Sequence, residues 1–171
     1  MLSKIEIKQS ETDLEMHNNA TCNWVRDYSK LMEIELYCSN PEYIQISGYG
    51  NFTCADTIKS KKILVRQYGA GESNFLFDVQ DLEVGFDSYG TMKASGSSEK
   101  GFYFTLSAGK LETHNLKTKI LGLITQGDRD LHVWAEDSIY GEIRNNNKVF
   151  YRGNPKVKIT APNQNQLVQE N

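Results

Sequence analysis

From residue 44 onward, the chain repeats one pattern about every nineteen residues: a short apolar stretch, a turn, and a second short apolar stretch. The turn residues that mark the period are Gly71, Gly90, Gly109, Gly127 and Asn146, which are 19, 19, 18 and 19 residues apart. The stretches before these turns, such as Ile63-Leu64-Val65, have the length and residue types of short β-strands. A fixed period of this size is typical of repeat proteins, in which each repeat is one structural unit.

The period predicts an all-β fold: a right-handed parallel β-helix, built as a single-stranded solenoid with coils of about nineteen residues. One coil cannot bury its apolar side chains alone, whereas stacked coils place them over one another and form a continuous core. Gly and Asn are expected at the turns because both tolerate a positive φ. An antiparallel sandwich is the open alternative, although its hairpins do not predict a constant nineteen-residue return.

The length of the chain fits one domain over residues 1–171. Within it, residues 41–162 are expected to hold the β-helical repeats. Residues 163–171 are rich in Gln and Asn, and we expect them to form a flexible tail.

The first forty residues do not follow the repeat. They contain two strand-like stretches, residues 4–8 and 33–37, around an irregular segment that includes Trp24. We expect residues 1–40 to cap the stack, because an uncovered end strand pairs readily with another chain. The opening residues alternate like a strand and contain no apolar h-region, so they do not form a signal peptide. The chain is therefore either cytoplasmic or a mature portion of an exported protein.

Charge and hydropathy exclude two functional classes. The net charge is −3, and Lys and Arg are scattered singly, whereas a nucleic-acid-binding face needs a clustered basic stripe. The nearest approach to a basic cluster, Lys59 with Lys61 and Lys62, is interpreted as a solvated turn. No apolar run approaches the roughly 20 residues that a membrane-spanning helix needs.

The sequence predicts no metal, no cofactor and no catalytic residue. Cys22, Cys38 and Cys54 lack the CxxC spacing of zinc sites and are interpreted as small buried hydrophobes, with one disulfide plus one free thiol as the open alternative. The three histidines lie far apart, and no calcium-binding loop is present. Residues 69–74 begin like GxGxxG but lack the last glycine and a following helix, which excludes dinucleotide binding.

The densest polar cluster covers residues 128–137. On a strand, Asp130, His132 and Trp134 would share one face, with the two apolar residues between them on the other. One interpretation is a carbohydrate platform, in which an aromatic ring flanked by carboxylates binds a sugar. The other is an ordinary exposed face of one coil, and this is the interpretation that we favour.

Three tyrosines precede successive turn glycines: Tyr49, Tyr68 and Tyr89. If their side chains point outward, they form a ladder along one edge, and tyrosine suits binding surfaces because it combines apolar area with a polar tip. If they point inward, the same ladder is structural. The sequence leaves both alternatives open.

Two stretches resemble a known bacterial family. Residues 147–157 contain Val149-Phe150-Tyr151-Arg152-Gly153-Asn154-Pro155, and residues 44–50 contain an apolar line followed by Ser47-Gly48-Tyr49-Gly50. Both resemble lines of the auto-transporter adhesin head GIN domains, a family of essentially unknown function, and the resemblance extends over residues 30–160. The chain departs from the expected Gly-Ser-Gly at residues 126–128 and 145–147. The resemblance implies a β-helical fold and an exported location in the periplasm, the outer membrane or the cell surface.

Together these observations favour a non-enzymatic envelope or surface domain that presents a rigid β-helical face to a ligand or partner, in the manner of an adhesin, with a glycan as one candidate ligand. A second hypothesis is a carbohydrate-active enzyme on a β-helix, similar to polysaccharide lyases. A third is a structural module that forms homo-oligomers by stacking through its coil ends.

Overall fold

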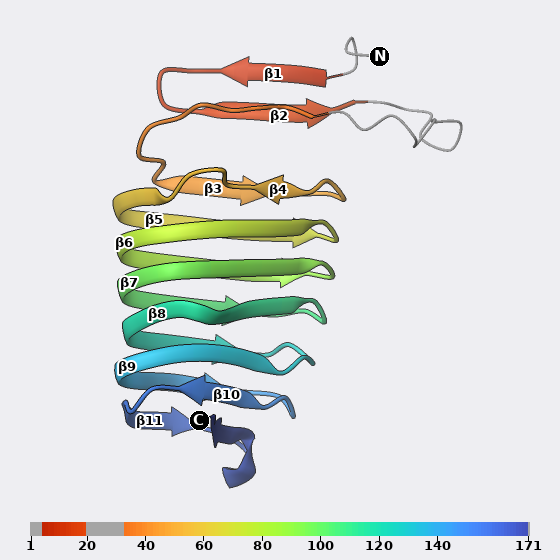
Figure 1. Ribbon diagram of the computed structural model, residues 1–171. Coiled ribbons are helices and arrows are strands. Elements are labelled where there is room, and N and C mark those ends of the chain that lie inside the picture. The colour runs from red at the N-terminus through yellow and green to blue at the C-terminus, as the bar shows by residue number, and fades with distance from the viewer. Residues whose placement is uncertain (1–4, 20–32, 171) are drawn as a thin grey trace. The chain divides into compact units, whose positions relative to one another are not determined.

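The computed structural model describes residues 5–19 and 33–170 (Figure 1). The chain divides into two compact units, Met1–Tyr37 and Cys38–Asn171. The described residues are almost all in strands or turns, with one short 3-10 helix and no α-helix among them.

In the first unit, strands β1 (Ile5–Gln9) and β2 (Leu14–Asn18) pair in antiparallel fashion. Strand β1 overlaps the strand that the sequence predicted at residues 4–8. Residues 33–37 form no strand, although their alternation resembles one, because alternation alone provides no neighbouring strand to pair with. Trp24 lies outside the described residues, and the predicted capping role of residues 1–40 stays a prediction.

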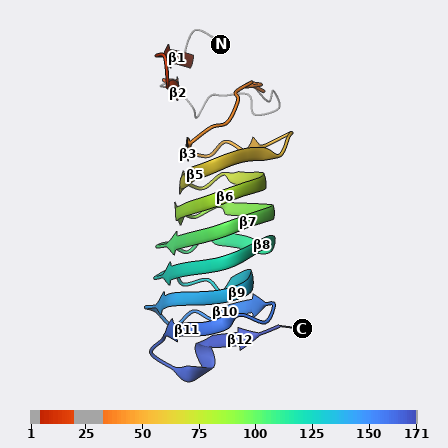
Figure 2. The same ribbon diagram turned by 90° about the vertical axis from the view of Figure 1, so that its left-hand side faces the viewer.

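The second unit is a parallel β-solenoid of about seven turns. Its strands are β3 (Tyr43–Ile46), β4 (Phe52–Thr53), β5 (Ile58–Gly69), β6 (Glu72–Ser88), β7 (Thr91–Thr105), β8 (Lys110–Thr125), β9 (Leu131–Ile143), β10 (Val149–Arg152), β11 (Lys156–Thr160) and β12 (Leu167–Gln169). Every strand pairing described in this unit is parallel, and the chain winds in the right-handed sense (Figures 1 and 2). The predicted β-helix is confirmed, and the antiparallel sandwich is wrong.

Each coil is flattened into two layers joined at a corner (Figures 1 and 2). Layer A contains β3, the C-terminal halves of β5 to β9, and β11; layer B contains β4, the N-terminal halves of β5 to β9, β10 and β12. Strand β6, for example, runs through layer B up to Val79 and through layer A from Asp81. The strands are longer than the short segments that the sequence predicted, because parallel pairing continues around the corner.

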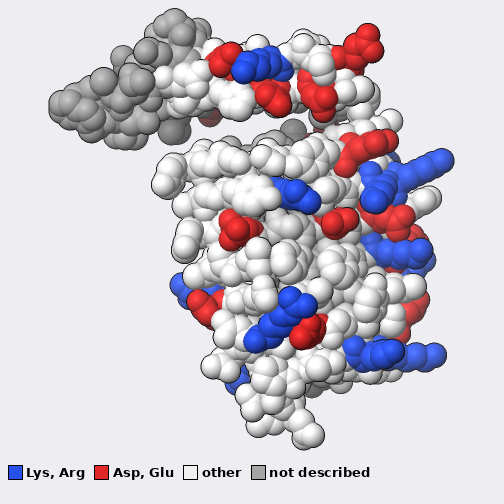
Figure 3. Space-filling model, turned by 180° about the vertical axis from the view of Figure 1, so that it is seen from behind, with Lys and Arg blue, Asp and Glu red and all other residues white. Residues whose placement is uncertain are grey.

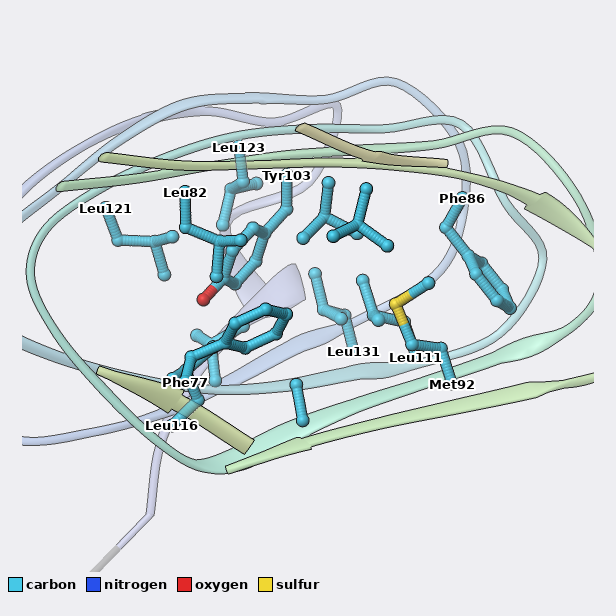
Figure 4. Close-up of a cluster of buried hydrophobic side chains, with 14 of the residues drawn as sticks. Phe77, Leu82, Phe86, Met92, Tyr103, Leu111, Leu116, Leu121, Leu123 and Leu131 are labelled. Atoms are coloured by element: carbon cyan, nitrogen blue, oxygen red, sulfur yellow. The ribbon is translucent and has the colours of Figure 1, made fainter. Parts of the chain in front are cut away.

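The core lies between the two layers. Figure 4 shows Leu82 and Tyr103 of layer A pointing toward Phe77 and Leu116 of layer B. Stacked positions in successive coils carry apolar side chains, as in Val65, Val84, Tyr103 and Leu123. The Tyr103 hydroxyl lies 3.2 Å from Thr118 Oγ1, and burial raises the pKa of this hydroxyl above its ordinary value.

The marker residues at the turns do not have the positive φ that the sequence predicted. Among the described residues, positive φ occurs instead at Asn40 and at five other glycines, Gly48, Gly69, Gly96, Gly141 and Gly153. Glycine is needed at the marker turns for a different reason, which is close approach between coils. A Cβ on Gly71 would lie 1.9 Å from the carbonyl oxygen of Gly50, and one on Gly90 would lie 2.0 Å from that of Gly71.

The coil length varies more than the glycine spacing indicates. Ile44 pairs with Val65, Val65 with Val84, and Val84 with Tyr103, so the first step is two residues longer than the next two. A register shift between Lys93 and Ser95 then lengthens the following coil. Such bulges insert a residue without interrupting the stack.

Residues 163–169 differ from the flexible tail that the sequence predicted. They form the 3-10 helix η3 (Gln164–Gln166) and β12, which pairs with β10. The Gln166 side chain is 4% exposed and donates to the backbone oxygens of Asn145 and Asn147. A polar composition fits this ordered end because the amides bind backbone groups of the preceding coil.

Cys38 and Cys54 are free thiols, exposed and half-buried respectively. Burial raises the pKa of the Cys54 thiol to about 11. Cys22 lies outside the described residues. The exposure of Cys38 differs from the buried small hydrophobe that the sequence favoured.

Candidate functional site

The outer face of layer B carries the polar cluster that the sequence singled out. In β9, Leu131 and Val133 are buried, whereas His132 and Trp134 are half-buried on the outer face. Asp130 lies just before the strand and is exposed. The predicted alternation of the two faces is therefore confirmed.

The side chains of this cluster are occupied by contacts with neighbouring coils. The His132 ring stacks on Phe150, with centroids 4.8 Å apart and planes 10° apart, and its Nδ1 lies 3.1 Å from the Glu170 carboxylate. The Lys117 Nζ lies 4.8 Å from the centroid of the Trp134 ring. Asp130 accepts a hydrogen bond of 2.8 Å from the Lys148 backbone N–H.

Such contacts resemble the cross-strand pairs that stabilise sheets. A sugar platform needs a free ring face and free polar groups. The cluster around β9 provides few of either, since the His132 ring faces Phe150 and the Trp134 ring faces Lys117. Its geometry favours the ordinary structural role over the carbohydrate platform.

The three tyrosines do not form a continuous ladder. Tyr49 and Tyr89 are 88% and 78% exposed, but the residue between them in the stack is Ala70. Tyr68 pairs in register with Asp87 and lies two positions earlier in its coil. Their spacing of 19 and 21 residues hid this offset, because the coils differ in length.

The outer face of layer A is more apolar. Its exposed large hydrophobic side chains include Tyr43, Leu106, Ile120 and Tyr140. Figure 3 shows this face from behind: uncharged side chains cover most of its middle, with a few separate charged ones among them, and charged side chains are most frequent along one edge. One row of outward-facing residues, which we call the layer A column, runs across all the coils: Tyr43, Leu64, Glu83, Phe102, Gly122, Tyr140 and Lys158.

Gly122 sets the shape of the middle of this column. A Cβ at Gly122 would lie 2.8 Å from Cδ2 of Phe102 and 2.8 Å from Cζ of Tyr140. The two side chains come from the coils on either side, and they cover the glycine from outside. Aromatic side chains commonly cover a strand glycine in this way. The result is an aromatic surface in the middle of the sheet.

A shallow depression of about 220 Å³ adjoins these rings. Its lining includes six residues whose side chains face outward: Lys62, Asp81, Glu83, Lys100, Phe102 and Tyr140. We call these six residues the aromatic depression. Lys62, Asp81 and Lys100 are stacked in register at the corner of successive coils and are exposed.

The charged residues of the aromatic depression are free of partners within the described chain. Lys62, Asp81, Glu83 and Lys100 make no side-chain hydrogen bond or ion pair with any residue that the structure describes. Other exposed charges on the solenoid do form ion pairs, as in Lys93 with Glu72 and Lys119 with Glu99. The depression thus combines an aromatic floor with polar groups that are available to a ligand.

This site was not predicted from the sequence, in which Lys62 is interpreted only as part of a solvated turn. The available signal was the strand alternation in Phe102-Tyr103-Phe104, which places two of three aromatic rings outside. A second signal was Gly122 in the middle of an apolar strand, which often marks a close approach. The sequence does not show that the side chains of Tyr140 and Phe102 both lie over Gly122.

No group of three or more His, Cys, Asp or Glu side chains that could hold a metal ion occurs among the described residues. Over the same part of the chain, no helix is long and apolar enough to cross a membrane.

The fold is a parallel β-solenoid, and both candidate sites, the aromatic depression and the polar cluster around β9, lie on its outer faces. Residues 1–155 match the family described as "Putative auto-transporter adhesin, head GIN domain", and the chain belongs to this family. The match covers more of the N-terminal region than the resemblance at residues 30–160 predicted. No curated protein and no solved structure was found to match the chain. The description of the family is that of an adhesin rather than an enzyme, and it suggests an exported or cell-surface location.

Proposed function

We propose that this chain is a non-enzymatic, adhesin-like domain of the bacterial cell surface and that it binds a glycan in the aromatic depression. The family supports an adhesive role at an exported location. The β-solenoid supports a rigid scaffold, since its outward-facing side chains are held by a parallel sheet at a regular spacing.

One observation carries the choice of site: the depression places the rings of Phe102 and Tyr140 beside charged groups that have no partner. Sugar rings have apolar C–H faces that pack on aromatic rings and hydroxyls that both donate and accept hydrogen bonds. The ammonium group of Lys62 donates, and the Asp81 carboxylate accepts. The apolar face of a sugar can therefore pack on the rings while its hydroxyls bind the charged groups.

The charges favour a glycan over a protein partner. The buried centres of protein interfaces are depleted of Lys, Glu and Asp, because these groups are costly to desolvate without a partner. In the depression, such residues directly adjoin the aromatic floor. A hydroxyl-rich ligand replaces the water around them with hydrogen bonds of the same kind.

Replacing Tyr140 tests the site. We expect the wild-type protein to bind a subset of glycans on an array, and Tyr140→Ala to lose binding by about tenfold in titration calorimetry, because loss of the ring removes apolar contact area. Tyr89→Ala is the matched control, since Tyr89 is 78% exposed outside the depression and should leave affinity unchanged. Circular dichroism of each variant checks that the fold is retained.

Three outcomes would overturn the proposal. Absence of binding to any glycan argues against adhesion through sugars. Loss of binding in Trp134→Ala but not in Tyr140→Ala would move the site to the outer face of layer B, where a carbohydrate platform was one of two interpretations of the sequence. Release of cleaved products from a bound glycan would show a carbohydrate-active enzyme instead.

A further inference from the structure

We infer that the aromatic depression is the central part of a longer track, and that the track holds consecutive sugars of an extended glycan chain lying along the solenoid axis. This inference rests on the proposed function and concerns the length and direction of its ligand. A short glycan would contact only residues of the depression, whereas an extended chain would also contact the residues at the two ends of the layer A column, such as Tyr43 and Lys158.

The layer A column has the geometry of a track. Its seven residues occupy the same outward position in successive strands, from Tyr43 in β3 to Lys158 in β11. Neighbouring strands lie about 4.8 Å apart, so six strand spacings extend over about 29 Å. One strand spacing is comparable to the length of one sugar in an extended chain. Successive coils can therefore present successive sugars with equivalent contacts.

Aromatic rings are available along the column and not only at its centre. Tyr43 is 48% exposed and Tyr140 is 43% exposed, with the half-buried Phe102 between them. From Tyr43 to Tyr140 the column crosses five strand spacings, or about 24 Å. A ligand that contacts both tyrosines must contain several sugars.

A second row of side chains accompanies the column along the corner. It consists, in register, of Lys62, Asp81, Lys100, Ile120, Ser138 and Lys156. Five of these six residues carry hydrogen-bonding side chains. Their repetition from coil to coil suits a ligand with a repeated pattern of hydroxyls, because one isolated sugar would use only two or three of them.

At the two outward-facing glycines of this face, Gly85 and Gly122, the space of the missing side chain is filled by neighbouring residues. At Gly85, on the other side of the column, a Cβ would lie 3.3 Å from Cγ of Arg66, so the stem of this arginine lies flat over the glycine. At Gly122, Phe102 and Tyr140 lie over the backbone in the same manner. At both glycines, side chains of neighbouring coils therefore cover the backbone of the sheet.

The charges of the track also select a ligand. Lys62, Lys100, Lys156 and Lys158 lie on it, against Asp81 and Glu83. The lysines are therefore in excess here, although the whole chain has a net charge of −3. A chain that carries carboxylates should bind more tightly than a neutral chain of the same linkage, and the difference should shrink at high salt.

The test uses two series of oligosaccharides with the same β-1,4 linkage that differ in charge: neutral cello-oligosaccharides and acidic oligomannuronates. Each series runs from the single sugar to about the octamer. We expect affinity to rise with length until the chain covers the track, and the acidic series to bind more tightly. Binding that stays constant beyond the disaccharide would overturn the track but leave the depression as a glycan site. If neither series binds at any length, the track is also overturned, whereas the proposed function fails only if the glycan array is negative as well.

Tyr43→Ala separates the track from the depression. We expect it to weaken binding of the longest oligosaccharide about three- to tenfold and to leave binding of the disaccharide unchanged, because Tyr43 lies about 24 Å from Tyr140. The matched control is Tyr49→Ala, which removes an exposed tyrosine from the same coil but outside the column. An equal effect of Tyr43→Ala on short and long chains, or no effect on either, would contradict the inference.

Discussion

At the scale of single residues, the glycines of the solenoid are required by neighbours more than by their own backbone angles. The distance from a would-be Cβ to a carbonyl of the preceding coil is about as short at Gly71, where φ is ordinary, as at Gly96, where φ is +109°. Parallel strands stacked this tightly leave no room for a methyl group at the turns. The same principle acts on side chains at Gly122, where the neighbours are rings instead of carbonyls.

Gly141→Ala should destabilise the solenoid by about 2 kcal/mol or more. Gly141 has a φ of +129°, and its Cβ would lie 1.8 Å from the Leu123 carbonyl oxygen. A left-handed φ alone costs an L-residue about 1–2 kcal/mol, and the clash adds to this cost. Urea unfolding followed by circular dichroism measures the loss of free energy.

Gly50→Ala is the control for this measurement. No atom lies within 4 Å of a Cβ at Gly50, and its φ is not positive. We expect its free energy of unfolding to change by no more than about 0.5 kcal/mol. Equal stability of the two variants would contradict the steric argument.

At the scale of elements, the last coil is held by polar contacts more than by apolar burial. Strand β12 has three residues, none of them fully buried. The preceding η3 provides the buried Gln166, whose Oε1 accepts a hydrogen bond of 2.9 Å from the Asn163 backbone N–H. The same side chain donates to two carbonyls of the coil before it, so one residue binds three backbone groups and links η3 to the preceding turn.

Gln166→Ala should release this last coil without unfolding the rest. It leaves the buried carbonyl of Asn147 without a donor, and an unsatisfied buried group costs about 1–3 kcal/mol. We expect amide hydrogen exchange in β12 to accelerate about tenfold or more, with exchange in β7 unchanged. Gln164→Ala, an exposed neighbour in η3, should leave exchange unaffected. Unchanged exchange in β12 for Gln166→Ala would refute this role.

At the scale of the whole molecule, the solenoid is a one-dimensional stack. Each coil contacts the coils before and after it, and the sheet ends at β3 on the N-terminal side. Strand β3 pairs only with β5 among the described residues. An end strand with free backbone groups invites pairing with a second chain unless something covers it. The sequence assigned this covering role to residues 1–40.

Removing residues 1–37 tests that role. The separation of the chain into the units Met1–Tyr37 and Cys38–Asn171 indicates that the second unit has its own core. We expect the shortened protein to keep its β-sheet circular dichroism but to self-associate with rising concentration in sedimentation velocity, while the full chain associates less. Equal association of both proteins would show that residues 1–37 do not cover the edge.

The repeat made the architecture predictable. A nineteen-residue period with apolar alternation admits few folds, and the parallel β-solenoid satisfies it, as Val65, Val84 and Tyr103 show by stacking at that interval. Alternation also placed His132 and Trp134 on an outer face correctly. The ordered role of Gln166 was not predictable, because a polar residue near a chain end usually remains solvated.

The candidate site was less accessible to sequence reasoning than the fold. Phe102, Gly122 and Tyr140 are 20 and 18 residues apart, and a strict nineteen-residue count places them out of register. The tyrosines Tyr68 and Tyr89 show the opposite error, since nearly regular spacing suggested a ladder that the register does not form.

The sequence by itself determined the coil, the turns and the two faces of each strand, because these follow from local periodicity along one chain. Only the tertiary structure decided which outward side chains meet across coils. These contacts between coils depend on the register of the strands and on the direction in which each ring points. One inserted residue is enough to change the register. Gly122 is the example: the sequence contains a glycine in a strand, and the fold makes it the floor beneath two aromatic rings.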